Sequence, residues 1–589
     1  MRNQGSSSVC RLAGRLACVL AVMGSAETTR AAEARSPQAP VVLGSAAGSW
    51  LVGTPDGAID MVFARAAGEG LELARRRTTD RGRSWSTPAT IMKLPAKNWS
   101  TPLTLLARDG ELHFFWMVAR GTGRRPAVDY FIDIWHARST HRQTTWSQPK
   151  RIFEGYVGSI NGMAQLRNGR LVLPFAYWVG GRPEAPPTGA NVTTTIHSDD
   201  GGETWVASGA ALTAPCYEGY NGANYGACEP TVVELKDGRV WMLIRTQTGW
   251  LYESFSKDGA RWCEPRPSRL CSSDSPACLT RLSDGRIAVF WNNCENTSRV
   301  DGEGVYTNRD VLHGAISGDE AKTWRGYREV CRDPFRNDPP PRRGDRGTAY
   351  PYATAMKDGK ILLVSGQGHG RRNILLVDPE WLCETRHMDN FSGGLEGWCV
   401  FKAFGPAKGW WRNRTQGPKL IDHPSKAGAK VLHVRRPDEK EGDGAVWNFP
   451  MGRRGTLSIR ILLRQGFGGA SIALADRFIQ PTDQVGEKKV LAVLPIRADG
   501  RLPNGARLRL DRWCTIGLAW DLDKRECAVS VDQKPVSVLT MSKRPSPGAC
   551  YLRLRSTAPT LDRAGFLVDA VEADVGATSA PRDGVTSKR

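Results

Sequence analysis

Ser198-Asp-Asp-Gly-Gly-Glu-Thr-Trp205 is the clearest copy of a short phrase that occurs five times in the first part of the chain. Three looser copies end at Trp85, Trp262 and Trp324, and a degenerate copy without the Asp and the Gly ends at Trp146. In such a phrase the Ser and Asp side chains bond the backbone of a turn, Gly adopts a positive φ, and Trp buries its ring beside the next unit. A hairpin device repeated at long spacing predicts an array of similar β-sheets.

A second repeat consists of an apolar run, an Asp-Gly or Asn-Gly pair and another apolar run. Its six turns begin at Asp56, Asp109, Asn168, Asp237, Asp284 and Asp358. A two-residue turn of this composition between strand-like runs is the strongest short-range signal of a β-hairpin. Five of the six hairpins are followed by a Trp-bearing turn that suits a second hairpin, and two hairpins make a four-stranded blade. We therefore predict that residues 40–387 form a six-bladed β-propeller, with Pro40–Leu43 as the strand that closes the last blade.

The pattern changes near residue 387. From 388 to 575 the Trp phrase is absent, and alternating strands follow, as in Gly455–Leu463 and Trp513–Asp521. Such runs predict an antiparallel β-sandwich, and their general pattern resembles the laminin-G or concanavalin type of jelly roll. Carbohydrate binding and passive packing are both compatible with this domain. The chain is thus predicted to be all-β, with a polar, disordered tail at 576–589.

Residues 1–34 are predicted to be a secretory signal peptide rather than part of the fold. Three arginines precede an apolar run at Leu16–Val22, and small residues follow up to Ala32, near which cleavage is expected. The run is too short to span a membrane, and nothing later in the chain resembles a transmembrane segment. The mature protein is therefore expected to be exported, either secreted or periplasmic.

The formal net charge of +21 suggests an anionic partner. An exported basic protein attracts polyanions, but here Lys and Arg are spread along the chain and are not combined with an aromatic RNA-binding motif. Nucleic acid is therefore not the predicted partner, and acidic glycans fit better. A solvated basic surface without a specific partner is the other interpretation.

Two of the 14 cysteines lie in the signal peptide, which leaves an even number, 12, in the mature chain. In an oxidising compartment this number allows disulfides, and closeness in sequence suggests three pairs. These pairs are Cys216/Cys228, Cys263/Cys271 and Cys278/Cys294. The chain has no Cys-x-x-Cys pair and no His-Glu-x-x-His stretch, so we predict neither a metal nor an organic cofactor.

The repeated phrase resembles the Asp box, or BNR repeat, of the sialidase superfamily, and the resemblance covers residues 40–387. It implies a propeller with a glycoside hydrolase site for terminal sialic acid or a related acidic sugar. In this family a tyrosine is the nucleophile, a glutamate is its base partner, three arginines hold the substrate carboxylate, and an aspartate is the general acid. Asp boxes also occur in non-catalytic propellers and in polysaccharide lyases.

Two residues that suit this chemistry occupy equivalent positions of the hairpin repeat. Glu229 lies eight residues before Asp237, Tyr350 lies eight residues before Asp358, and each is followed by Pro. Because the innermost strand of every blade starts near the central axis, both side chains should converge at one mouth of the tunnel. The anomeric carbon of sialic acid carries a carboxylate that repels an anionic nucleophile. A tyrosine whose proton passes to a nearby Glu attacks as a neutral group instead.

Two arginines match the carboxylate clamp that the resemblance implies. Arg245 follows Glu229 by sixteen residues, at the end of the next apolar run, and Arg309 lies eight residues before Ser317 of an Asp box. A planar guanidinium can bind a carboxylate through two parallel hydrogen bonds. We therefore predict that Arg245 and Arg309 bind the substrate.

The chain departs from the family pattern at two points. The first arginine of the family is missing, because the matching stretch is Ala47-Gly-Ser-Trp50. The general acid is not recognisable either. Glu69 is the only carboxylate of its loop and is our prediction for this role, with Asp129 in the following blade as a rival. The substrate is therefore not necessarily sialic acid.

Two other functions are open on this scaffold. In a lyase or hydrolase acting on another anionic polysaccharide, Tyr350 would be a base or an acid, and the arginines would neutralise a uronate. In a non-catalytic glycan-binding propeller, the same residues would hold a sugar without cleaving it. The sequence does not fix the sugar, its linkage or the oligomeric state.

Overall fold

The computed structural model describes residues 36–46, 50–68, 70–94, 103–140, 145–158, 160–180, 189–216, 226–295, 308–338, 347–367, 372–404, 413–439, 441–484 and 486–576. Residues from Pro37 onward form one compact unit. The predicted signal peptide at 1–34 and the tail beyond Gly576 lie outside the described residues, as do Ala47–Ser49 and Glu69. Among the described residues, no helix is both long enough and apolar enough to cross a membrane.

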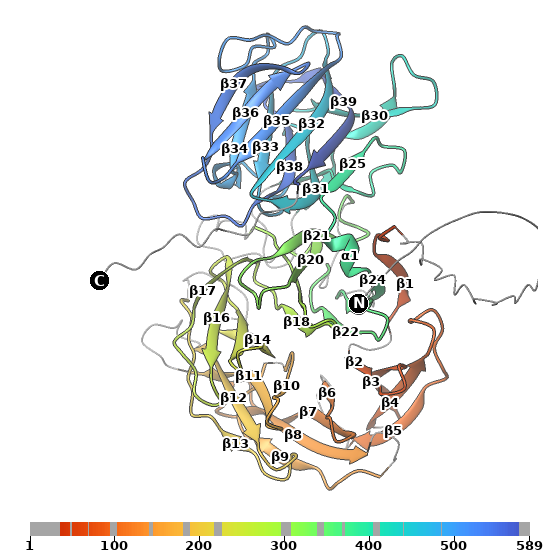
Figure 1. The fold of residues 1–589 in the computed structure, drawn as a ribbon, viewed down its shortest axis with the longest axis vertical. Coiled ribbons are helices and arrows are strands. Elements are labelled where there is room, and N and C mark those ends of the chain that lie inside the picture. Colours follow the sequence, from red (N-terminus) through yellow and green to blue (C-terminus); the bar gives the residue numbers. More distant parts are fainter. Residues whose placement is uncertain are drawn as a thin grey trace, which may run out of the picture. The chain divides into compact units, whose positions relative to one another are not determined.

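Six antiparallel sheets of four strands each make up the described part of residues 41–377. The first three are β2 (Trp50–Gly53), β3 (Ile59–Ala67), β4 (Gly70–Thr78), β5 (Ala89–Leu94); β6 (Leu103–Leu106), β7 (Glu111–Gly121), β8 (Tyr130–Thr140), β9 (Lys150–Phe153); and β10 (Ala164–Gln165), β11 (Leu171–Val179), β12 (Ala190–Ser198), β13 (Val206–Ala207). The last three are β14 (Cys228–Glu234), β15 (Val240–Arg245), β16 (Trp250–Ser256), β17 (Arg266–Cys271); β18 (Cys278–Arg281), β19 (Ile287–Trp291), β20 (Val311–Ser317), β21 (Arg325–Arg332); and β22 (Tyr352–Ala355), β23 (Ile361–Ser365), β24 (Asn373–Val377) with β1 (Val41–Ser45). The sheets lie around a common centre (Figure 1), so the predicted six-bladed propeller is confirmed.

The ring is closed by a strand from the N-terminal end of the domain. β1 pairs antiparallel with β24, with Val41 opposite Leu376, and completes the sixth sheet. Beside this closure, Lys357 of the sixth sheet donates a hydrogen bond to the carbonyl of Pro55 in the first. The strand predicted at Pro40–Leu43 is thus confirmed, and it starts one residue later than expected.

The Trp-bearing turns are built as the sequence predicts. In the clearest copy, Asp200 accepts hydrogen bonds from the Thr204 amide at 2.9 Å and from the Ser198 hydroxyl at 2.8 Å. The Gly202 amide donates to the oxygen of that hydroxyl at 2.8 Å. Gly202 has a φ of +87°, and a Cβ there would lie 2.9 Å from the His136 ring. The turn and the packing of the neighbouring blade therefore both require glycine.

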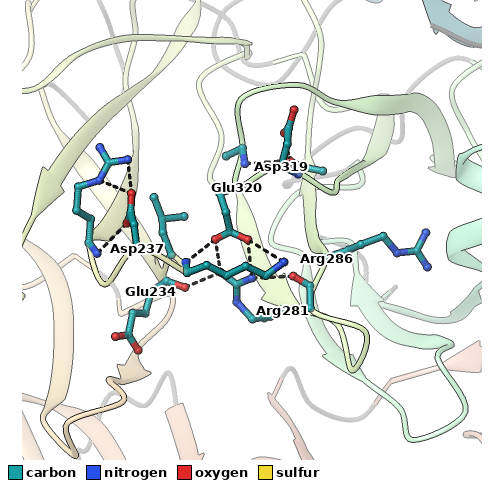
Figure 2. A network of polar contacts seen from close by, with 12 residues as sticks. Glu234, Asp237, Arg281, Arg286, Asp319 and Glu320 are labelled. Atoms are coloured by element: carbon teal, nitrogen blue, oxygen red, sulfur yellow. Dashed lines mark hydrogen bonds and ion pairs between the residues drawn. The ribbon is translucent and has the colours of Figure 1, made fainter. Parts of the chain in front are cut away.

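Basic residues link neighbouring blades through the hairpin turns. Figure 2 shows the carboxylate of Glu320, in the Asp-box turn between β20 and β21, as a shared acceptor for two of them. It binds the Arg281 guanidinium of its own blade at 2.9 and 3.1 Å. From the preceding blade, Lys236 reaches it through the backbone amide at 2.7 Å and through the side-chain Nζ at 3.7 Å. A Lys or Arg directly precedes four of the six turns, at Arg108, Arg167, Lys236 and Lys357. This repeated basic residue is a sequence signal for contact between blades, which turn composition alone does not predict.

Two further antiparallel sheets form the C-terminal region, as predicted, after the short helix α1 (Pro379–Leu382). One contains β25 (Arg386–Asp389), β29 (Lys419–Asp422), β30 (Lys430–Arg436), β32 (Arg454–Leu463), β35 (Cys514–Asp521), β36 (Glu526–Val531), β37 (Lys534–Thr540) and β39 (Asp562–Asp574). The other contains β26 (Trp398–Cys399), β31 (Gly444–Gly452), β33 (Ala470–Ala475), β34 (Ala492–Ile496) and β38 (Ala549–Ser556). A hairpin of β27 (Phe401–Phe404) and β28 (Asn413–Gln416) and a 3-10 turn at Gly486–Lys489 lie outside these sheets. Trp447 and Leu552 from the second sheet and Ile459 from the first share one buried apolar core.

The second of these sheets packs against the propeller. One buried apolar cluster contains Trp291 and Tyr327 of the propeller together with Phe478 of the C-terminal region. Within it, the Asn448 side-chain amide donates to the Tyr327 carbonyl at 3.0 Å. The contact therefore buries apolar surface and provides an acceptor for the Asn448 amide that it covers.

The predicted disulfides are wrong. Cys263, Cys271, Cys278 and Cys294 are free thiols, and the last three are buried. The thiols of Cys216 and Cys228 each donate to a backbone carbonyl, so this pair is not a disulfide either. Neighbouring positions in sequence lie on different strands and faces of a blade, so closeness along the chain does not bring two sulfur atoms into bonding geometry.

A histidine buried between the propeller and the C-terminal sheets leads to a prediction about the stability of the protein in acid. His313 accepts a hydrogen bond from the Asn293 amide through Nδ1 at 3.1 Å, and its Nε2 lies 2.6 Å from the Tyr551 hydroxyl. Burial lowers the pKa of His313 to about 3. In the unfolded chain a histidine has a pKa of about 6.5, so between these values only the unfolded state binds the proton. We expect the free energy of unfolding to fall as pH decreases below about 6.5, by up to about 1.4 kcal/mol per pH unit from this group alone.

Urea unfolding of the mature protein at pH 7.5, 6 and 5 measures this slope. His113 and His136, whose pKa values burial lowers to about 4 and about 3, act in the same direction. His313→Gln should therefore make the free energy of unfolding less dependent on pH, by the amount that corresponds to one bound proton, without abolishing the dependence. An identical slope in the variant and the parent would contradict the assignment.

Candidate active site

Two side chains reach the same point from the starts of two inner strands. Glu229 lies in β14, and Tyr350 lies two residues before β22. These first strands of their sheets both contact β18, the first strand of the sheet between them. Glu229 has a φ of +48° and Tyr350 a φ of +59°, and each precedes a proline. Such a backbone is costly for a residue with a side chain and is concentrated at functional sites.

The two side chains are hydrogen-bonded to each other. The Tyr350 hydroxyl donates to Glu229 Oε1 at 3.2 Å, and Glu229 is 7% exposed. Burial raises the pKa of Tyr350, the Glu229 charge raises it further, and the charges of Arg309 and Arg245 oppose this. The phenol is therefore protonated at neutral pH, with a carboxylate in place to take its proton, which is the arrangement of a nucleophile and an adjacent base.

Arg245 holds the other oxygen of Glu229. Its Nη1 donates to Glu229 Oε2 at 2.5 Å and its Nε donates to Asp274 Oδ1 at 2.6 Å, and the side chain is completely buried. Burial disfavours the cation, but Asp274 and Glu229 outweigh it, so that the pKa of Arg245 is raised. Asp274 is not among the residues predicted from the sequence. Its position shortly before β18 is the signal, because Glu229 and Tyr350 lie at the corresponding part of their repeats.

Arg309 completes the group from the start of β20. Its Nη1 donates to Gln367 Oε1, its Nη2 donates to the Asp274 carbonyl at 3.1 Å, and its guanidinium carbon lies 5.3 Å from the centre of the Tyr350 ring. Burial lowers the pKa of Arg309. The structure thus brings together the four described residues that the sequence singled out, Glu229, Arg245, Arg309 and Tyr350.

Two buried donors at this point have no hydrogen-bond acceptor among the described residues. They are Nη2 of Arg245 and Nε2 of Gln367. Gln367 follows β23 and belongs to the group because it binds Arg309. A buried donor without an acceptor costs about 1–3 kcal/mol unless a ligand supplies one. The site is therefore suited to a ligand rich in acceptor atoms, such as a carboxylate.

The propeller matches a known protein family. A family model described as BNR repeat-like domain matches residues 53–363, more than half of the chain. The chain belongs to this family. The matched span of the BNR repeat-like domain includes all four residues that converge on the axis, and no curated protein matches the chain.

Three solved structures similar to the BNR repeat-like chain show low identity. Trypanosoma rangeli sialidase in complex with sialic acid is 15% identical, with 91% of each chain covered and a TM-score of 0.38. A protein of unknown function from Dyadobacter fermentans is 17% identical, with 58% of this chain and 98% of that chain covered and a TM-score of 0.42. A Hadza microbial sialidase is 18% identical, with 56% and 65% covered and a TM-score of 0.40. Similarities of this size carry no inference about the site, which rests on its own geometry.

The two departures from the family pattern fall mostly outside the described part of this BNR repeat-like chain. Glu69, predicted as the general acid, lies outside it, as do Ala47–Ser49, where the first arginine would be expected. The rival Asp129 is described: it accepts a hydrogen bond from Arg125 Nε at 2.7 Å, which lowers its pKa. A carboxyl held ionised in this way is poorly suited to donate a proton at neutral pH. Within the described ranges, no group of three or more His, Cys, Asp and Glu is arranged to hold a metal ion.

Proposed function

We propose that this protein is an exported retaining glycoside hydrolase that removes a terminal acidic sugar, sialic acid or a relative of it. The observation that carries the proposal is the hydrogen bond of 3.2 Å from the Tyr350 hydroxyl to Glu229, whose second oxygen is held by Arg245. The predicted signal peptide supports export, and membership of the BNR repeat-like family supports the scaffold.

The chemistry assigns one task to each of these side chains. As the Tyr350 oxygen attacks the anomeric carbon, its proton passes to Glu229, and the bond to the leaving oxygen breaks. The leaving oxygen takes a proton from an acid, for which Glu69 is our prediction. Water then attacks the anomeric carbon and gives a proton to the deprotonated acid, while the glycosyl–tyrosine bond breaks and Glu229 returns its proton to the Tyr350 oxygen. The anomeric configuration is therefore retained overall.

The charges of the site favour tyrosine over a carboxylate as the nucleophile. Glu229 and Asp274 carry two negative charges and Arg245 and Arg309 two positive charges, so these four side chains have no net charge while Tyr350 is neutral. A carboxylate in place of Tyr350 would make this group net negative and would repel the substrate carboxylate next to the anomeric carbon, whereas a neutral phenol does not.

A panel of fluorogenic glycosides tests the proposal. We expect the mature protein to cleave a 4-methylumbelliferyl α-sialoside or β-glucuronide with a kcat/KM about 100-fold or more above that for the β-galactoside, because the buried donors need an acidic partner. Proton NMR of the first product anomer checks retention. Folded protein that cleaves none of the acidic glycosides would contradict the proposal, and an unsaturated uronide among the products of a polyuronate would indicate a lyase instead.

A further inference from the structure

Asn292, the first residue after β19, is completely buried in the propeller. Its Nδ2 donates to the Val311 carbonyl at 2.7 Å and to the Thr348 hydroxyl at 3.1 Å. Its Oδ1 accepts a hydrogen bond of 2.7 Å from the Ser275 hydroxyl. Both N–H groups and the carbonyl of this one amide are therefore bonded, and they join three segments that are far apart in the sequence.

Each of these three partners lies one or two residues from a member of the candidate site. The pairs are Ser275 with Asp274, Val311 with Arg309, and Thr348 with Tyr350. Consecutive Cα atoms are about 3.8 Å apart, so a hydrogen bond that fixes one residue limits the position of the next. The Asn292 side chain therefore limits how far the three members can move relative to one another.

Asp274 is held through both of its neighbours. The Ser273 amide donates to the Asn292 carbonyl at 3.2 Å, and the Ser275 hydroxyl donates to the Asn292 side chain. Asp274 lies between these two contacts, and its carboxylate accepts the hydrogen bond from Arg245. Because Arg245 in turn holds Glu229, the position of the base depends on a segment that Asn292 fixes.

Thr348 extends the contact of Asn292 to the Arg309 backbone. Its hydroxyl accepts from Asn292 and donates to the Arg309 carbonyl at 3.1 Å, and its amide donates to the same carbonyl at 2.8 Å. Thr348 is 2% exposed and lies two residues before Tyr350. The nucleophile and the second arginine of the site are thus connected through one chain of hydrogen bonds that begins at Asn292.

The backbone that carries Asn292 is itself held by the C-terminal region. The next residue, Asn293, donates from Nδ2 to the Asp476 carbonyl at 2.9 Å and accepts from the Phe478 amide at 2.9 Å through its own carbonyl. The preceding residue, Trp291, shares a buried apolar cluster with Phe478. A polar side chain supported on both sides in this way is suited to hold other residues in a precise geometry.

We infer that Asn292 is a positioning residue of the candidate site, which holds the segments of Asp274, Arg309 and Tyr350 at the separation that the reaction needs. It acts through these segments and not on the substrate, because it is completely buried and its amide is fully bonded within the protein. The inference rests on the proposed function. Misplacement of reacting groups by a distant change can cost about 100-fold in rate.

Steady-state hydrolysis of the acidic glycoside that the parent cleaves tests the assignment in the mature protein. Asn292→Ala removes all three side-chain hydrogen bonds. Thr348→Val keeps the shape of the side chain and loses its hydroxyl, whereas Thr348→Ser keeps the hydroxyl. Circular dichroism at the assay temperature gives the concentration of folded protein, to which every rate is referred.

Asn448→Ala is the matched control for the loss of a buried asparagine. Asn448 is 2% exposed, and its side chain also accepts one hydrogen bond and donates two. All three partners are backbone groups at the contact between the propeller and the C-terminal sheets, and none of them is next to a residue of the candidate site.

We expect Asn292→Ala to lower kcat about 10- to 100-fold and to raise KM less than about threefold, because attack depends more steeply on geometry than binding does. Thr348→Val should lower kcat about tenfold, and Thr348→Ser should recover most of this loss. The double variant of Asn292→Ala and Thr348→Val should lose less than the product of the two single effects, since both break one chain. Asn448→Ala should lower Tm about as much as Asn292→Ala and leave kcat within about twofold.

The outcomes distinguish the role of Asn292 from the proposed function. A parental kcat in folded Asn292→Ala, or an equal loss of kcat in Asn448→Ala, would overturn the role of Asn292 alone. If Asn292→Ala does not fold, the Thr348 pair decides, and equal rates of Thr348→Val and Thr348→Ser would overturn that role. A parent protein that cleaves no acidic glycoside would overturn the proposed function and this inference with it.

Discussion

Replacement of Tyr350 by Phe should reduce kcat on a cleaved acidic glycoside by about 10⁴-fold or more. The variant keeps the aromatic ring and loses only the oxygen that attacks the anomeric carbon, so no covalent intermediate can form. The fold should be retained, because the lost hydrogen bond to Glu229 is one of several contacts of that carboxylate. Steady-state kinetics gives the rate, and mass spectrometry after reaction with a slow fluorinated glycoside shows whether a sugar is attached to the protein.

The matched control for this variant is Tyr327→Phe. Tyr327 is also buried and also has a positive φ, +54°, but it packs at the contact between the propeller and the C-terminal sheets. Its replacement should leave kcat within about twofold of the parent. More than a tenth of the parental rate in Tyr350→Phe, or a sugar attached to another residue, would show that Tyr350 is not the nucleophile.

Replacement of Glu229 by Gln should reduce kcat by about 10²- to 10⁴-fold, because the amide cannot take the proton of Tyr350. Gln has nearly the same shape and can still accept the hydrogen bond from Arg245. Arg245 keeps Asp274 as a partner, so we expect a stability loss of about 1–3 kcal/mol rather than unfolding.

The rate of hydrolysis at neutral pH and the midpoint of urea unfolding together check this prediction. Glu234→Gln is the matched control, because Glu234 lies at the other end of β14 and pairs with Arg167 at 3.2 Å on the surface. Its replacement should not change the rate. A Glu229→Gln variant that keeps more than a tenth of the parental rate would show that Glu229 is not the base that takes the proton of Tyr350.

The repeats made the catalytic pair predictable. In a propeller every blade places the same repeat position at the same height and distance from the axis, so the alignment of Asp237 with Asp358 also aligns Glu229 with Tyr350. The structure adds that both residues share an uncommon backbone conformation. The arginines followed from the family pattern and from strand ends, which lie on the same side of the sheets as the pair.

Partners that come from other blades were not predictable in this way. Asp274 binds Arg245, and Gln367 binds Arg309, across sequence separations of 29 and 58 residues. The position of Asp274 near the start of a first strand is a weak signal, and nothing in the local pattern marks Gln367, because a polar side chain after a strand is common. The three proposed disulfides failed for a related reason, since sequence distance does not report which face of a blade a cysteine occupies.

The sequence by itself determined the six four-stranded sheets, the strand that closes the ring and the meeting of Glu229 with Tyr350. These follow from turn chemistry and from a repeat, which are properties of neighbouring residues and of their period along the chain. Only the tertiary structure decided which charges are balanced and which are not. Arg245 has two carboxylate partners, whereas Arg309 binds the Gln367 side chain and the Asp274 carbonyl. The reason is physical: the pairing of a buried charge depends on the side chains that surround it in space, and these come from different blades.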